Sequence, residues 1–172
     1  RRVLDIGSGS FYGPALMAKK ANSVLGIESN RAAVLQAKLT WLSVRNLHCR
    51  QGDNLSAVAG HFGLVSIINV IEHIPPGHAM DFLRVAVEHL DSNGLLILAT
   101  PRDRSKSNAG RFENPDHQVE YSENTLSALI RTADLRVKHR YIQTMTEIKP
   151  GGEQNVHFEE RAWFIWVLKR AA

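Results

Sequence analysis

Short runs of apolar residues alternate along this chain with longer segments in which apolar residues recur at helical spacing. The predicted strands are residues 3–6, 23–27, 46–51, 64–70, 94–99, 135–143 and 162–168. The run at 64–70 is apolar almost throughout, which is typical of a central parallel strand buried on both faces. This alternation of strands and helices predicts an α/β fold in which helices cover a doubly wound sheet.

Four segments have helical periodicity. We expect helices at 15–18, at 31 to about 42 with Ser29 or Asn30 as N-cap, at 77–90, and after the N-cap Ser122. Trp41 is expected in the helix layer or at its edge. The side chains predicted to face the sheet are Val34, Leu35, Lys38, Leu39 and Leu42 in the second helix, Ala79, Leu83, Ala86, Val87 and Leu90 in the third, and Leu126, Leu129, Ile130 and Ala133 in the fourth.

Three segments carry turn signals or polar composition. Residues 91–94 are predicted to form a turn before the fifth strand, and residues 144–160 a hairpin connection. The polar stretch at 101–120 has a length that is usual for a functional loop in a compact domain.

A glycine turn follows the first strand and opens the first helix. Gly7 and Gly9 fill the first and third positions of a dinucleotide fingerprint, but the sixth position is Tyr12. Asp5, two residues before the first glycine, would repel a phosphate. A second strand with an acidic tip, Glu28, completes the mononucleotide-binding half of a doubly wound sheet. The turn therefore favours a ligand with a ribose and a cationic amino group over a pyrophosphate.

The strand that ends in Asp5-x-Gly7-x-Gly9 resembles the first motif of the class I S-adenosylmethionine-dependent methyltransferases. The resemblance implies S-adenosyl-L-methionine as cofactor, with Glu28 accepting hydrogen bonds from both ribose hydroxyls; taken alone, Glu28 could equally be a solvated acid at a helix start. Phe11 stands where the family often has a further glycine. The residues that the resemblance assigns to the cofactor are Asp5, Gly7, Ser8, Gly9, Phe11, Glu28, Ser29, Asp53, Asn54, Asn69 and Val70.

Two later segments extend the resemblance. Asp53, after the third strand, would accept a hydrogen bond from the adenine amino group, although Gly-Asp-Asn is also an ordinary turn. Residues 70–75 resemble the Glu-His segment after strand four, which implies that Asn69 faces the methionine end and that Glu72 and His73 lie beside the transferred methyl group. The family fold is a Rossmann-like, seven-stranded, mostly parallel sheet, in which we expect the last strand to be antiparallel and at the edge, beside strand five.

Methyl transfer needs mainly an aligned nucleophile, and a base only when the nucleophile is as poor as a hydroxyl. His73 is the candidate base, because imidazole titrates close to neutral pH, and Glu72 is the residue that could orient it. The alternative is that the His73 ring only closes the loop against strand five. His117 and Tyr121, in the segment after strand five, are the candidate acceptor-binding residues.

Glu72, His73 and His117 also resemble part of the ligand set of the metal-dependent small-RNA 3′-terminal 2′-O-methyltransferases, where two glutamates and two histidines hold a divalent ion. Asn69 stands where the first glutamate would be, and the loss of a hard oxygen ligand weakens Mg²⁺ or Mn²⁺ binding. We therefore predict no metal, although three ligands with an open position can hold one.

The chain has 172 residues, and we expect residues 1–172 to form one methyltransferase domain. Cys49 is the single cysteine, which excludes an internal disulfide and a cysteine-rich zinc site and fits a cytoplasmic protein. No apolar run approaches the ~20 residues that a membrane span requires. The chain starts directly on a strand and without methionine, so we expect that it lacks the helices that usually precede this strand or that it is one domain of a longer protein.

A net charge of +4 and a pI near 9.5 permit an anionic partner such as nucleic acid, although the positive residues are scattered along the sequence. The leading hypothesis is an enzyme that methylates oxygen or nitrogen of a small metabolite, a quinone precursor or a sugar. The alternatives are an RNA methyltransferase, motivated by the charge and the histidine set, and a catalytically silent scaffold, motivated by Phe11 and Asn69. The acceptor and the oligomeric state stay open.

Overall fold

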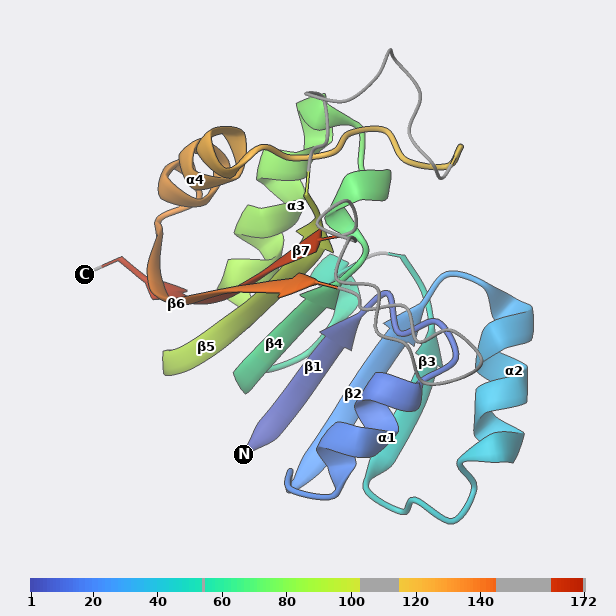
Figure 1. Cartoon of the computed structure of the whole chain (residues 1–172). Helices are drawn as coiled ribbons and strands as arrows, with labels where there is room; N and C mark the ends of the chain where they lie inside the picture. The colour runs from blue at the N-terminus through green and yellow to red at the C-terminus, as the bar shows by residue number, and fades with distance from the viewer. Residues whose placement is uncertain (54, 103–114, 145–161, 172) are drawn as a thin grey trace, which may run out of the picture.

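A computed structural model shows a seven-stranded sheet with helices on both faces (Figure 1). The structure describes residues 1–53, 55–102, 115–144 and 162–171. The strands are β1 Arg2–Ile6, β2 Ser23–Glu28, β3 Leu47–Gln51, β4 Phe62–Ile68, β5 Leu90–Pro101, β6 Leu135–Thr144 and β7 Ala162–Arg170. The helices are α1 Tyr12–Ala18, α2 Arg31–Thr40, α3 Pro76–Glu88 and α4 Glu123–Thr132, with 3-10 turns η1 Leu55–Ala57 and η2 Ile71–His73.

The strand order is β3-β2-β1-β4-β5-β7-β6. Strands β1 to β5 pair in parallel, and β7 runs antiparallel to both of its neighbours, β5 and β6. The direction in which the chain adds strands reverses between β1 and β4, and doubly wound sheets bind ligands outside the carboxyl ends of the strands at such a switch point. The predicted doubly wound fold with seven strands is confirmed.

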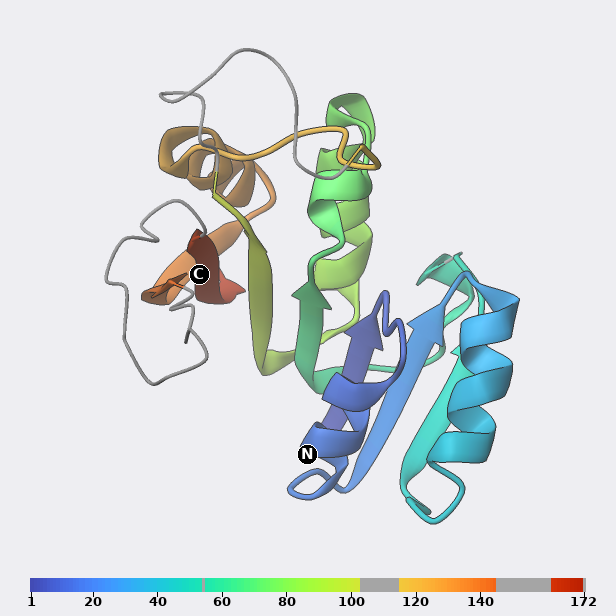
Figure 2. The same ribbon diagram turned by 45° about the vertical axis from the view of Figure 1, so that its right-hand side comes forward.

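The two faces of the sheet bury separate layers of side chains, because successive residues of a strand point to opposite faces. Helices α1 and α2 cover one face, where Val3 packs with Ala18 of α1 and Phe11 packs with Val34 of α2. Helices α3 and α4 cover the other face and share the main core (Figures 1 and 2). The core side chains from the strands include Leu4, Ile6, Val65, Ile67, Leu96, Leu98, Phe164, Trp166 and Leu168.

Both predicted N-caps are present. The side-chain oxygen of Asn30 accepts hydrogen bonds from two backbone N–H groups in the first turn of α2, the shorter at 2.9 Å. Ser122 caps α4 in the same way. Trp41 lies half-buried at the edge of the helix layer, where its indole N–H donates to the carbonyl oxygen of Ser10 at 2.9 Å.

The last strand is beside β5 and antiparallel as expected, but its predicted edge position is wrong, because β7 lies between β5 and β6. The side chains explain the order. Phe164, Trp166 and Leu168 of β7 are buried, whereas β6 exposes Arg136 and Lys138, charges that protect an edge strand from pairing with other chains.

Two further expectations concern connections between elements. Residues 91–94 are part of β5 rather than a separate turn, and the pairing register with β4 shifts next to them. An added Cβ at Gly94 would lie 3.0 Å from two backbone oxygens, so the chain bends tightly there without leaving the sheet. Of the predicted hairpin connection at 144–160, Thr144 ends β6 and the rest lies outside the described residues, as does most of the loop at 101–120. Within the described residues, no helix has the length and apolar character that a membrane crossing needs.

Helix α2 buries a different face from the predicted one. Val34 is buried as expected, but Leu35 is 53% exposed, Leu39 is 78% exposed, and Leu42, just after the helix, is 80% exposed. Ala37 is buried instead, because its small side chain lets the helix lie close to the sheet. Three leucines predicted to be in the core are therefore at the surface.

Candidate cofactor and acceptor site

A crevice of about 460 Å³ opens at the carboxyl ends of β1, β2 and β4. Its predicted members are Gly7, Gly9, Glu28, Ser29, Asp53, Asn69, Val70 and His73, and they are joined by Ile6, Ile27, Gly52, Leu55, Ile74 and Phe82. Residues from five separate stretches of the sequence thus meet in one cavity. The predicted cofactor residue Asn54 lies outside the described residues.

The glycine turn lies against the end of β2. Gly7 and Ser8 both donate backbone hydrogen bonds to the carbonyl oxygen of Ile27, at 2.9 and 3.0 Å. Gly7 has φ +72°, and an added Cβ there would lie 2.3 Å from the Val70 side chain, so both the backbone conformation and the packing require glycine. Gly9 has φ +51° with open space above its Cα, which leaves room for a ligand over the turn.

Phe11 is not among the crevice-lining residues, and its assignment to the cofactor stays a prediction. Its backbone has the left-handed conformation, φ 61°, that a glycine would adopt more readily. Its ring is fully buried against Val34 and Ala37, and an added Cβ on Gly26 would lie 2.6 Å from it. The ring thus fills the space between β2 and α2, and the aromatic side chain does not block the crevice.

Asp5 is buried beneath the glycine turn and is not among the crevice-lining residues. Its two carboxylate oxygens accept hydrogen bonds from the hydroxyl groups of Ser8, at 2.8 Å, and Ser66. Burial raises the pKa of this carboxyl to about 6, and the bonds from Ser66 and Ser8 partly oppose the rise. In this structure Asp5 and Ser8 therefore support the turn from below, and their assignment to the cofactor stays a prediction.

Glu28 lies in the crevice wall at the tip of β2. One carboxylate oxygen accepts from the backbone N–H of Gly9 at 2.9 Å, and the other accepts from the backbone N–H of Asn30 at 2.8 Å and the hydroxyl of Ser29 at 3.2 Å. These bonds hold the carboxylate in a fixed orientation at the cavity. Asp53 follows β3 and lines the same cavity on the side of η1.

The opposite wall is the segment after β4. Asn69 has φ 53°, and its backbone N–H donates to the carbonyl oxygen of Ala99 at 2.9 Å. This left-handed residue redirects the chain from β4 into η2, and it brings Val70 against Gly7. Asn69 and Val70 therefore close the crevice on the side where the resemblance expects the methionine end.

Glu72 is fully buried and joins η2 to β5 and to the chain after it. Thr100 donates a hydrogen bond to its Oε2 at 3.0 Å, and its backbone carbonyl oxygen accepts from the N–H groups of Gln118, at 2.7 Å, and Val119, at 3.1 Å. Its Oε1 and the buried hydroxyl of Tyr121 have no hydrogen-bond partner among the described residues. Burial raises the pKa of Glu72, and it raises the pKa of Tyr121 to about 12, with a smaller contribution from the Glu72 carboxylate.

His73 and His117 meet beside Glu72. Their ring centroids are 4.9 Å apart, and one ligand atom from each of Glu72, His73 and His117 lies within 4.8 Å of the others. His73 is exposed in the crevice wall, with its Nδ1 3.1 Å from the carbonyl oxygen of Asp116. His117 is only 10% exposed, with its Nδ1 3.2 Å from a carboxylate oxygen of Glu120. The structure thus brings together all four residues predicted for catalysis and acceptor binding, Glu72, His73, His117 and Tyr121.

Sequence reasoning missed three residues that orient this group: Thr100, Asp116 and Glu120. Glu120 follows His117 by three residues, a spacing that could have suggested the contact. Asp116 acts through its main chain and Thr100 comes from a distant strand, so no local signal could have indicated them.

The strand order, the crevice at the switch point and the carboxylate at the tip of β2 define a Rossmann-like α/β protein that binds a nucleoside-containing ligand. A family model described as "Methyltransferase domain" matches residues 1–140. The chain belongs to this methyltransferase family.

Relatives with assigned activities support the same class. The protein-L-isoaspartate O-methyltransferase of Serratia proteamaculans is 33% identical over 101 residues, which are 56% of this chain and 45% of that protein. The enzyme of the same name from Yersinia enterocolitica is 29% identical over 121 residues, 69% of this chain and 55% of that protein. The chain therefore spans about half the length of the curated relatives that it matches.

Solved structures share the fold at low sequence identity. The YcgJ protein of Bacillus subtilis aligns with a TM-score of 0.74 at 15% identity, over 99% of this chain and 92% of that one. DhpI, solved as a complex with SAH, aligns with a TM-score of 0.69 at 15% identity, over 99% of this chain and 76% of that one. The predicted methyltransferase fold and family are confirmed.

The residues in the crevice fit S-adenosylmethionine as the cofactor. The cavity is within the ~300–1,000 Å³ range of small-ligand sites. The open space above Gly9 and the buried position of the Phe11 ring leave the turn accessible. An oriented carboxylate, Glu28, lines the cavity together with apolar side chains such as Ile27 and Leu55, and it offers the acceptor that the free hydroxyls of a nucleoside need.

Proposed function

We propose that the chain transfers the methyl group of S-adenosylmethionine to a hydroxyl oxygen of a small-molecule acceptor, with His73 as the base. The observation that carries this proposal is the hydrogen bond between Nδ1 of His73 and the carbonyl oxygen of Asp116, at 3.1 Å. A carbonyl oxygen can only accept, so the neutral ring carries its proton on Nδ1 and has its lone pair on Nε2. The ring lines the crevice, and that lone pair is the group that a hydroxyl proton requires.

In this proposal the crevice residues divide the cofactor between them. Glu28 binds the ribose hydroxyls, Asp53 the adenine side, and Gly7, Asn69 and Val70 surround the methionine end. The bound cofactor supplies an electrophilic methyl group on a sulfonium ion. The acceptor lies on the His73 side, with His117 and Tyr121 as its further neighbours.

His73→Ala is expected to lower turnover on a hydroxyl acceptor about 10²-fold or more, in the range of general-base effects, with cofactor affinity unchanged. A panel of phenols, catechols, sugars and an isoaspartyl peptide, assayed with radiolabelled S-adenosylmethionine, identifies the acceptor class. The isoaspartyl peptide is informative because a carboxylate has no proton to lose and needs no base.

His61→Ala is the matched control, because His61 is exposed just before β4, at the end of that strand remote from the crevice. Its turnover should equal that of the unchanged chain. Equal turnover in His73→Ala on a hydroxyl acceptor removes the base assignment. If the chain methylates only the isoaspartyl peptide, and His73→Ala is fully active on it, the acceptor is a carboxylate and not a hydroxyl.

A second candidate function is metal-assisted methylation of a ribose hydroxyl in RNA. The specific observation in its favour is the set Glu72, His73 and His117, whose ligand atoms lie within 4.8 Å of one another and include a buried carboxylate oxygen without a hydrogen-bond partner in the described part of the chain. Sequence reasoning predicted no metal, and this geometry favours testing that expectation. Activity on RNA that is lost with a chelator and restored by Mn²⁺ or Zn²⁺ supports the candidate, and chelator-insensitive activity removes it.

The scaffold alternative has a direct test. Calorimetric titration of the folded chain with S-adenosylmethionine should give a binding isotherm. A folded chain that produces no heat and no methyl transfer to any acceptor would favour a scaffold.

A further inference from the structure

Helix α2 and the turn after it expose three leucines. We define the leucine stripe as Leu35, Leu39 and Leu42, which are 53%, 78% and 80% exposed. Leu35 and Leu39, four positions apart, lie on one side of α2, and Leu42 follows in the turn that ends the helix. The opposite side of α2 already packs on the sheet through Val34 and Ala37. The leucine stripe is therefore a second apolar face that no described part of the chain covers.

Neighbouring helix α1 adds to this surface. It covers the same face of the sheet and exposes Tyr12 by 65% and Leu16 by 51%. Five of the eight large hydrophobic residues that are exposed among the described residues thus come from α1, α2 and the turn after α2. Isolated exposed apolar residues are ordinary, but a concentration of them on two adjacent helices marks an interaction surface.

The same part of the chain is strongly positive. Residues 6–52 contain six cations, Lys19, Lys20, Arg31, Lys38, Arg45 and Arg50, and only one acidic residue, Glu28 in the crevice. This segment therefore has a net charge of +5, more than the +4 of the whole chain. The positive residues look scattered in the sequence, but the fold places Arg31 and Lys38 on α2, and Lys19 and Arg45 line one groove with Tyr12 and Leu16.

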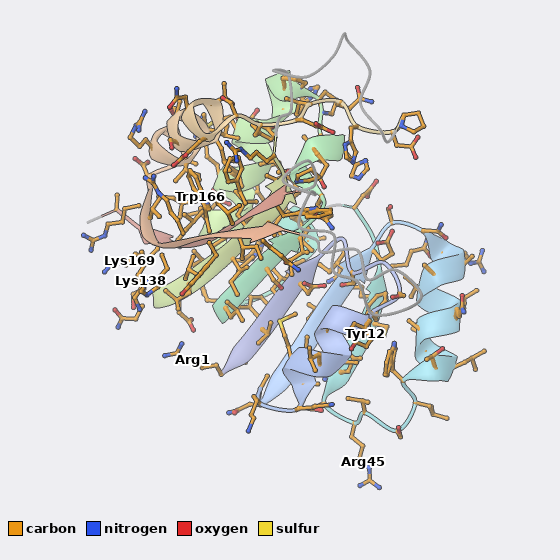
Figure 3. All side chains as sticks on the ribbon, viewed as in Figure 1. Arg1, Tyr12, Arg45, Lys138, Trp166 and Lys169 are labelled. Atoms are coloured by element: carbon orange, nitrogen blue, oxygen red, sulfur yellow. The ribbon has the colours of Figure 1, made fainter. Side chains whose placement is uncertain are left out.

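Two of the cations lie beside the leucine stripe itself. Arg31 precedes Leu35 by four residues, and Lys38 follows Leu35 by three, so helical geometry makes both of them neighbours of the leucines. Figure 3 shows Arg45, in the turn before β3, projecting away from the molecule, and Figure 1 shows α2 at its outer margin. Helices that lie in a membrane interface have this arrangement: leucines enter the bilayer, and the long side chains of neighbouring lysines and arginines reach the head groups.

A shallow groove next to these residues has the same chemistry. It has a volume of about 420 Å³, lies between α1 and the turn after α2, and is lined by Tyr12, Leu16, Trp41 and Val44 together with Lys19 and Arg45. The groove thus offers an apolar floor beside two positive charges, which suits an amphiphile with an anionic head group.

We infer that the α1–α2 face docks on an anionic lipid surface through the leucine stripe. Exposed leucines make no favourable contact with the charged backbone of a nucleic acid, so they argue against RNA or DNA as the ligand of this face. A second copy of the chain would bring the same cations against this face, which disfavours self-association. A bilayer that contains acidic lipids matches both properties, because the leucines enter the interface while Arg31 and Lys38 meet the head groups.

Vesicle co-sedimentation tests the inference with the chain as it is. The unchanged chain should sediment with vesicles of equimolar phosphatidylcholine and phosphatidylglycerol, and much less with phosphatidylcholine alone. Binding should fall as salt rises, because the cations contribute through screened attraction. The double variant Leu39→Gln, Leu42→Gln should lower vesicle partitioning at least about tenfold, because it removes two of the three apolar side chains that enter the interface.

Thr40→Gln is the matched control, because Thr40 is exposed on the same helix but outside the leucine stripe. It should bind vesicles like the unchanged chain, and all three proteins should have the same thermal unfolding midpoint within a few degrees. Glutamine is a good helix former, so the double variant should fold. Methyl transfer to a water-soluble acceptor should be equal in all three, because the stripe is outside the crevice.

Each other occupant gives a different result. If the unchanged chain fails to sediment with the acidic vesicles, or if the double variant binds them equally, the inference is overturned. A concentration-dependent dimer that the double variant abolishes, without vesicle binding, would assign the stripe to a second copy. Binding to an immobilised acidic amphipathic peptide, again without vesicle binding, would assign it to a protein partner.

Discussion

Asp5 gives the sharpest prediction about stability, because its carboxyl group is buried where an ionised group is disfavoured. Its pKa is about 6 in the folded chain, against 3.8 for the ordinary group. A carboxyl with the higher pKa in the folded state binds its proton more tightly when folded, so it favours the folded state below about pH 4. That contribution is lost as the pH rises from about 4 to 6.

The size of the effect follows from the shift. At 1.36 kcal/mol per pKa unit, a rise from 3.8 to about 6 means that ionised Asp5 costs about 3 kcal/mol of folding free energy at neutral pH. Asp5→Asn keeps the shape of the side chain, cannot ionise, and can still bond the hydroxyls of Ser8 and Ser66, which are able to accept as well as donate. Relative to the unchanged chain, the variant should therefore gain roughly 2 to 3 kcal/mol between pH 4 and pH 7.5.

Urea unfolding of both proteins at several pH values measures this difference, and groups that titrate alike in the two proteins cancel from it. Asp81→Asn is the control, because the Asp81 side chain is 76% exposed in a helix-surface pair with Arg84. Its free energy difference from the unchanged chain should vary little with pH. If the difference in unfolding free energy between Asp5→Asn and the unchanged chain does not vary with pH, burial does not raise the pKa of Asp5 and the reasoning is refuted.

Two other variants probe the turn and the acceptor side. Gly7→Ala should lower the free energy of unfolding by roughly 2 to 5 kcal/mol, because the new Cβ would meet Val70 and the backbone has positive φ. Gly13→Ala is the control: Gly13 is in α1 with open space around it, so this variant should be neutral or slightly stabilising in the same denaturant titration. Equal losses of stability in both variants would contradict this account. Glu120→Ala should raise the KM for the acceptor about three- to tenfold, because His117 loses the carboxylate that orients it. The Kd for S-adenosylmethionine should not change. A KM equal to that of the unchanged chain would mean that Glu120 has no orienting role.

The part of the fold that could be predicted depends on local signals. The first strand, the turn at Gly7 and Gly9 and the acidic tip at Glu28 are adjacent in sequence and obey rules of short range, so the pattern predicted them correctly. The edge position of β7 failed because strand order is set by packing between distant segments. The predicted burial of Leu35, Leu39 and Leu42 was wrong because the prediction assumed that apolar residues at helical spacing face the sheet. Ala37 packs there instead.

In the candidate site too, residue types could be predicted from the sequence but contacts between distant segments could not. His73 and His117 could be singled out by residue type, yet their contact depends on a connection of more than 40 residues that no periodicity describes. Phe11 is the most instructive residue. The resemblance assigned Phe11 to the cofactor, but no local signal indicated that its ring would fill the gap between β2 and α2. The backbone adopts the left-handed conformation that makes this burial possible.

The central claim is that the Glu28 carboxylate holds S-adenosylmethionine in the crevice, and calorimetric titration of the unchanged chain and Glu28→Ala tests it most directly. Glu88→Ala, on an exposed carboxylate that ends α3, is the control. The account predicts a measurable Kd for the unchanged chain and the control, and a loss of roughly 1.5 to 3 kcal/mol in Glu28→Ala, or roughly 10- to 150-fold in Kd. Equal affinity in a folded Glu28→Ala, or no binding by the unchanged chain, would contradict the account.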